Sequence, residues 1–106
     1  HRCANAAMVW ARPRGPSAPK MVLAYETLSE TNWLAPGITP AFTPNCYIDI
    51  GDHIDQKIAA FGQFESQVRE SPDERSPETI RALATVRGST VYHHSAEAFM
   101  VVRIAV

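Results

Sequence analysis

Residues 45–68 read NCYIDIGDHIDQKIAAFGQFESQV and predict a strand followed by an amphipathic helix. In the first part, Cys46, Ile48 and Ile50 alternate with other side chains, which is the period of a strand that buries one face. The rest of the fold is expected to cover the apolar surface that this strand and helix share.

The helix in this stretch is predicted to begin beside two aspartates. Asp49 stands where a helix N-cap is expected, and Asp52 is favourable near the positive end of a helix. Apolar residues then follow at the spacing of one helical face: Ile54, Ile58, Phe61, Phe64 or Glu65, and Val68.

The N-terminal part of the chain predicts another helix and another strand. The helix is expected from the first residue to about Arg12, because Pro13 and the prolines beyond it cannot continue it. Residues 21–25, MVLAY, are apolar throughout, which is typical of a strand buried on both faces of a parallel sheet. A helix, a short loop and a buried strand make half of a βαβ unit.

The C-terminal part predicts a capped helix and a final strand. Ser76 and Pro77 fit the N-cap and the first turn of a helix, and Gly88 is predicted to take the left-handed conformation that ends it. Residues 96–106, AEAFMVVRIAV, are rich in β-branched and aromatic residues and predict a strand, which begins either at once or after one helical turn at Ala96 to Phe99. The order of elements predicts an α/β fold with a mostly parallel sheet and flanking helices.

The length and charge of the chain narrow the classes of function. A chain of 106 residues forms at most one small domain. Its net charge of −1, without a basic cluster, argues against nucleic-acid binding. No apolar run approaches the ~18 residues that span a bilayer. Cys3 and Cys46 are the only cysteines and lie far apart, so we expect reduced thiols in a cytoplasmic protein.

Histidines are the first candidates for chemistry. His93 and His94 are adjacent, so in a strand they would face opposite ways and would not easily serve one metal. His53 lies in the first turn of a predicted helix. For all three, a solvated surface residue is the simpler interpretation. The sequence carries no short motif of a zinc protease, a dinucleotide-binding fold, a phosphate-binding loop or a serine hydrolase.

Residues 26–44 lack periodicity and contain several prolines. Loops of this length in compact domains are usually functional or poorly ordered. Trp33 is a large apolar side chain in this loop, and it is predicted either to pin the loop to the body of the protein or to contact a substrate.

A series of short pieces runs in order along nearly the whole chain. The pieces are His1-Arg2, Ala24-Tyr25-Glu26, Ser29-Glu30-Thr31, Trp33, Pro44-Asn45, Ile48-Asp49-Ile50, Lys57, Ala60, Glu65-Ser66-Gln67, Arg81-Ala82-Leu83-Ala84, Arg87-Gly88 and Ala96-Glu97-Ala98-Phe99. In order and spacing they resemble the C-terminal half of the LmbE/PIG-L family of zinc-dependent N-deacetylases.

The resemblance implies a Rossmann-like layered fold and hydrolysis of an acetamide by a zinc-bound water. Two zinc ligands and a general-base aspartate come from an AHPDD-type motif near the family's N-terminus. The third ligand ends an HxDH-type motif just before an alanine-rich helix, and His1 matches it. His1 is therefore the predicted Zn²⁺ ligand. The AHPDD-type motif is absent from this sequence, so no catalytic residue is assigned within it. Catalytic zinc takes three protein ligands, which His1 alone does not supply.

Other polar residues also match the family. Among them, Arg87 and Glu97 are expected to form a structural pair or cap in the C-terminal part. His93 and His94 stand where the family varies or carries glycine and an aromatic residue, so the resemblance assigns them no substrate contact.

The resemblance implies that residues 1–106 form a single partial domain of an enzyme that removes an N-acetyl group from an amino-sugar conjugate of the N-acetylglucosamine type. Trp33 is the candidate substrate contact. The alternative is a non-catalytic half-domain that acts in binding or assembly. In either case, a partial domain exposes a sheet edge, so the isolated chain is expected to self-associate.

Overall fold

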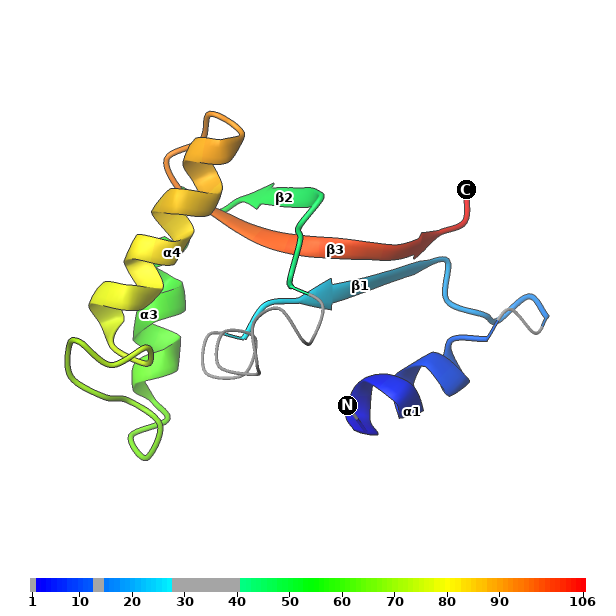
Figure 1. The fold of residues 1–106 in the computed structure, drawn as a ribbon, viewed down its shortest axis with the longest axis horizontal. Coiled ribbons are helices and arrows are strands. Elements are labelled where there is room, and N and C mark those ends of the chain that lie inside the picture. The colour runs from blue at the N-terminus through cyan, green and yellow to red at the C-terminus, as the bar shows by residue number, and fades with distance from the viewer. Residues whose placement is uncertain (1, 13–14, 28–40) are drawn as a thin grey trace.

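The computed structural model describes residues 2–12, 15–27 and 41–106. In Figure 1, a pair of packed helices stands at one end of the molecule, and a long antiparallel ribbon extends from it towards another helix. None of the helices in these ranges is long and apolar enough to cross a membrane. The elements are, in order, α1 (Arg2–Trp10), β1 (Met21–Tyr25), β2 (Cys46–Asp49), α3 (Ile54–Gly62), α4 (Pro77–Thr90) and β3 (Ala96–Ile104).

The sheet in the described residues is antiparallel, with the strand order β1-β3-β2. β3 is its centre, and Phe99 lies opposite both Tyr25 of β1 and Cys46 of β2. The prediction of a mostly parallel sheet with flanking helices is therefore wrong. Strands were predicted at all three places, and β3 begins at Ala96 without the helical turn that was the alternative there. The main error concerns how the strands pair.

The misleading signal was the apolar run of β1. A strand buried on both faces was expected, but β1 is an edge strand whose end residues, Met21 and Tyr25, are exposed. The helices α3 and α4 stand at one end of the sheet and leave much of the β1–β3 ribbon uncovered (Figure 1). A short apolar run has no alternation that could reveal this difference.

A small core joins the helices to the sheet. Ile50, Ile54 and Ala84 are buried together, and Ile58 packs against them. Ala96 and Ala98 are buried at the start of β3, where α4 packs on the sheet. Ile48, which the alternation placed on the buried face, is half exposed instead.

The start of α4 agrees with the sequence, whereas the start of α3 does not. Ser76 is the N-cap of α4, with its hydroxyl accepting a hydrogen bond from the Thr79 amide at 3.2 Å. Asp49 is not the N-cap of α3, because His53 holds that position. Asp49 ends β2 instead, and its carboxylate accepts a hydrogen bond from the Gly51 amide at 2.9 Å.

The end of α4 differs from the prediction in an informative way. Gly88 lies within the helix, and Tyr92 takes the left-handed conformation with a φ of 64°. The amides of Tyr92 and His93 donate to the carbonyls of Ser89 and Gly88, which is the hydrogen-bond pattern of a Schellman motif. Glycine is needed at position 88 because the backbone of the turn after α4 passes very close to it. A β-carbon there would lie 2.7 Å from the His93 carbonyl oxygen.

Candidate functional site

A buried ion pair links the end of β1 to α4. Arg87, in the last turn of α4, places Nη2 2.7 Å from Oε1 of Glu26, and its Nε donates to Oε2 at 3.1 Å. The Glu26 side chain is only 8% exposed and that of Arg87 is 23% exposed. Two parallel hydrogen bonds fix the plane of the carboxylate as well as its distance, so both groups are held in one orientation.

The surroundings of Arg87 keep it charged. The hydrogen bond to Glu26 raises the pKa of Arg87 above its ordinary value; burial acts in the opposite direction, and the charges of Glu26 and Tyr47 add to the rise. The guanidinium carbon also lies 5.9 Å from the centre of the Phe42 ring, within range of a cation–π contact. Phe42 precedes β2, so Arg87 brings together residues from both sides of residues 28–40.

A second ion pair stands nearby and is more exposed. Lys57 of α3 places Nζ 2.7 Å from Oε1 of Glu97 on β3, and both side chains are about 40% exposed. The expected pairing of Arg87 with Glu97 is therefore wrong, since each has another partner. The buried pair uses the arginine, whose planar fork matches a carboxylate, and the solvated pair uses the lysine.

A cavity of about 200 Å³ is shared by these two ion pairs. The four charged residues contribute to its wall, and β1, α4 and β3 supply the remainder. The other lining residues are Tyr25, Leu83, Ala84, Ala96, Ala98 and Phe99. Five of the pieces on which the family resemblance rests therefore meet around one cavity, although they are spread from residue 24 to residue 99 of the sequence.

Asn45, another matched residue, fastens the chain before β2 to the central strand. Its side-chain oxygen accepts a hydrogen bond from the backbone amide of Val101 at 2.8 Å. Its backbone amide donates a hydrogen bond to the backbone carbonyl of Phe99 at 2.9 Å. The Asn45 side chain thus gives the Val101 amide a hydrogen-bond acceptor just beyond the end of the β2–β3 pairing, where no β2 carbonyl is available. Asn45 thus has a structural role beside the cavity, and no chemical role is needed to explain it.

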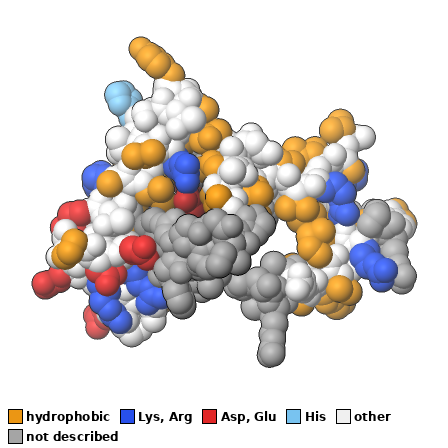
Figure 2. Space-filling view, viewed as in Figure 1, with side chains coloured by type: hydrophobic (Ala, Val, Ile, Leu, Met, Phe, Trp, Pro, Cys, Tyr) orange, Lys and Arg blue, Asp and Glu red, His pale blue; other side chains and the backbone are white. Residues whose placement is uncertain are grey.

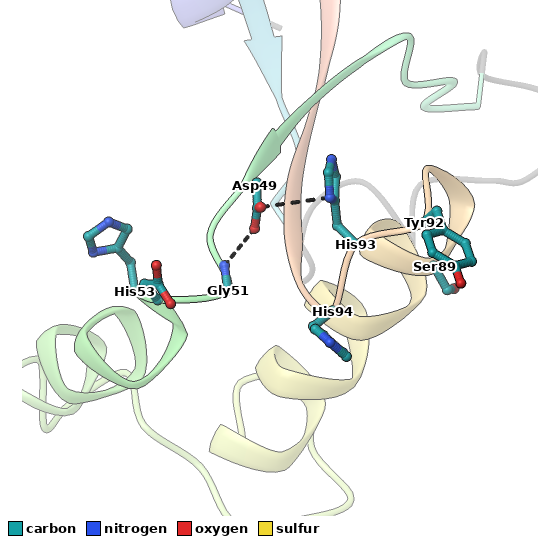
Figure 3. A pocket seen from close by; sticks show the side chains of 8 residues that line it. Asp49, Gly51, His53, Ser89, Tyr92, His93 and His94 are labelled. Carbon is teal, nitrogen blue, oxygen red and sulfur yellow. Dashed lines mark hydrogen bonds and ion pairs between the residues drawn. The ribbon is translucent and has the colours of Figure 1, made fainter.

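His53, His93 and His94 line a different hollow, of about 760 Å³, beside the turn between β2 and α3. His93 Nδ1 lies 3.7 Å from Asp49 Oδ2, and His53 Nδ1 is 3.1 Å from the Gln56 side-chain oxygen. Figure 3 shows His93 turned towards Asp49, with His53 and His94 pointing away from that pair. The hollow therefore has no point at which these imidazoles converge.

A zinc site was expected from the resemblance, with His1 as a ligand. Within residues 2–12, 15–27 and 41–106, no three His, Cys, Asp or Glu side chains come together to hold a metal ion. This part of the chain does not supply the three donors that catalytic zinc takes. Both His1 and Trp33 lie outside the described residues.

Sequence reasoning missed the partner of Glu26. The two members of the buried pair are 61 residues apart, on a strand end and a helix. A helical wheel or a strand alternation reports only neighbours within one element, so neither gives this contact.

Compared with models of known protein families, with curated proteins and with solved structures, the chain matches none.

Proposed function

We propose that the chain is the C-terminal part of a zinc-dependent N-deacetylase, which hydrolyses the acetamide of an amino-sugar conjugate of the N-acetylglucosamine type. His1 is the proposed metal ligand and Trp33 the proposed substrate contact. The remaining zinc ligands and the general base are expected from the AHPDD-type motif of the family, outside residues 1–106.

One observation carries the proposal furthest. Five of the twelve pieces that resemble the family line the cavity between the Glu26–Arg87 and Lys57–Glu97 pairs, although they lie far apart in the sequence. This common location supports the proposal.

The role proposed for the described residues is to hold a frame. Both carboxylate oxygens of Glu26 accept hydrogen bonds from Arg87, so Glu26 is not free to act as a general base. Glu97 is occupied by Lys57. These groups fix the ends of strands and helices relative to one another, and the hydrolysis itself is assigned to zinc and to the missing motif.

The experiment uses the full-length product of the gene that encodes this chain. Acetate release is measured with N-acetylglucosamine conjugates, first as purified, then after a chelator, then after zinc is restored. We expect release that the chelator abolishes and zinc restores. His1→Ala in the full-length protein is expected to lower the rate at least tenfold, whereas His53→Ala, at the other hollow, should leave it unchanged. A folded full-length protein that releases no acetate would contradict the proposal.

A second candidate function is non-catalytic assembly, and the uncovered apolar surface favours it. Figure 2 shows charged side chains interleaved over α3 and α4, whereas hydrophobic side chains dominate over α1 and the β1–β3 ribbon. Trp10 at the end of α1 is 87% exposed, and Met21 and Ile104, which face each other across β1 and β3, are also exposed.

Apolar patches of this kind on a small chain mark contact surfaces. The two candidate functions differ in one requirement. Assembly needs no metal, so a chelator would leave the assembly intact. The same chelator would abolish deacetylation. Sedimentation of the full-length product with and without chelator, beside the acetate assay, separates them.

A further inference from the structure

We infer that α1 and the β1–β3 ribbon form the interface of a homodimer, in which a second copy of this chain packs the same apolar surface against them about a two-fold axis. The surface consists of the exposed apolar side chains Met8, Val9, Trp10, Met21, Val102 and Ile104. The inference goes beyond the proposed hydrolysis, because it needs neither metal nor substrate, and it names the partner that assembly would require.

The chain exposes more surface than a folded monomer of its mass. A monomer of 11.7 kDa exposes about 5,900 Å². This chain exposes 8169 Å², an excess of roughly 2,300 Å². The radius of gyration is 15.6 Å, against about 13 Å for a compact chain of 106 residues. A standard interface covers about 800 Å² of each partner and an obligate dimer covers more, so the excess is enough for a stable dimer.

The exposed apolar side chains are concentrated on one part of the molecule. Most of the exposed large hydrophobic residues in the described ranges belong to α1, β1 and β3. Trp10 is the largest of them, and Met21 and Ile104 lie directly opposite each other across the ribbon, so they share one side of it. A large aromatic side chain among apolar neighbours is the usual anchor of a protein interface.

Helix α1 in particular needs something to pack on. It has nine residues, its side chains from Asn5 to Trp10 are all exposed, and it packs on no other helix or strand of the described residues. An isolated helix of fewer than about 12–15 residues is only marginally stable in water. The opposite surface of a second copy would supply the packing that α1 lacks within its own chain.

The charges of this surface favour a second copy as the partner. In a two-fold interface the same patch lies on both sides, so a charged patch would meet its own sign. The segments 21–25 and 99–104 contain one charged side chain, Arg103, and α1 has none from Asn5 to Trp10. The Arg103 guanidinium donates hydrogen bonds to two backbone carbonyls of the α1–β1 connection. Two copies can therefore meet here without opposing like charges, whereas the surface of α3 and α4 is charged (Figure 2).

The test exchanges charges between two copies. The full-length gene product is prepared as Trp10→Lys/Met21→Lys and, separately, as Trp10→Glu/Met21→Glu. Each variant is sedimented alone and in an equimolar mixture, and its melting temperature is measured to check folding. Tyr92→Lys and Tyr92→Glu are the matched controls, because Tyr92 is also highly exposed but lies in the turn after α4.

We expect the wild type and the controls to sediment as dimers. Each charged double variant alone should dimerise at least tenfold more weakly, because charges of one sign then meet across the axis. The mixture should recover dimers, because opposite charges then face each other. Recovery on mixing requires that two copies present this surface to each other, so it separates a homodimer from docking of any other partner.

Three results would overturn the inference: a monomeric wild type, charged variants that dimerise as well as the wild type, or a mixture that stays monomeric. Should the charged variants fail to fold, Trp10→Ala decides, with Tyr92→Ala as its control. A dimer weakened at least tenfold by Trp10→Ala alone supports the interface, and an unchanged dimer overturns it. Mass is measured separately from acetate release, so this inference and the proposed deacetylase function fail independently.

Discussion

A β-carbon on Gly88 would lie 2.8 Å from the backbone nitrogen of Ser95, closer than side chains pack. Helix α4 therefore meets the turn into β3 backbone to backbone, and only glycine allows this approach. The contact sets the position of Arg87, the preceding residue on the same helix, and so connects the packing of α4 with the geometry of the candidate site.

Gly88→Ala is expected to destabilise the fold. Overpacking of a tight site typically costs about 1–3 kcal/mol, which exceeds the ~1 kcal/mol that alanine gains over glycine in a helix. Chemical denaturation should show a lower midpoint with an unchanged slope. Gly62→Ala is the matched control, because nothing lies within 4 Å of a β-carbon there, and it should be neutral or stabilising. Equal effects at the two glycines would show that the close approach is unimportant.

Tyr92 offers a substitution in the opposite direction. It is 97% exposed and holds the left-handed conformation, with a φ of 64°, that glycine adopts without steric cost. Tyr92→Gly is expected to raise stability by about 0.5–1 kcal/mol. Val91→Gly is the control, since Val91 has an ordinary φ of −120° and should only lose stability. A destabilised Tyr92→Gly would show that the tyrosine ring makes contacts that outweigh its backbone strain.

The buried ion pair predicts a particular pH dependence. Because the pKa of Arg87 is raised on folding, its contribution is fully present below the pKa of the unfolded chain and is lost only as pH rises through the still higher folded value. Removing one partner of a buried pair costs about 3–5 kcal/mol. The stability difference between wild type and Arg87→Met should therefore be large and constant from about pH 7 to pH 10. A difference that vanishes within this range would mean that Arg87 does not carry the charge of the pair.

The exposed apolar surface predicts self-association of residues 1–106 in isolation. Trp10→Lys, in α1, should lower the average mass seen in sedimentation at micromolar concentration, because it places a charge on the uncovered side. Tyr92→Lys introduces the same charge at an equally exposed aromatic residue in the turn after α4, and should leave association unchanged. A wild-type chain that sediments as a monomer at all concentrations contradicts this prediction.

Local signals in the sequence predicted the type and place of most elements, but α3 ends at Gly62, whereas the apolar spacing had predicted a helix that reaches Val68. The hydroxyl and proline at Ser76 and Pro77 gave the start of α4, because capping depends on neighbouring residues only. The prolines after Arg12 likewise gave the end of α1 to within two residues, and the β-branched run within residues 96–106 gave the position of β3 but not its exact length.

Local signals of this kind could not predict how the strands pair. Residues 21–25 could have been buried in a parallel sheet or laid along an antiparallel edge, and the choice depends on contacts with β3 about 80 residues away. The same holds for Glu26 and Arg87, whose contact is set by how α4 crosses the sheet. The role of Gly88 was misread for a related reason, since a glycine near a helix end serves equally well as a cap or as a point of close approach.

The most direct test of the account is acetate release from an N-acetylglucosamine conjugate by the full-length gene product, followed through removal and return of zinc. The account predicts release that stops with the chelator and resumes with zinc. A folded protein that releases no acetate, or whose release is indifferent to the chelator, would contradict it.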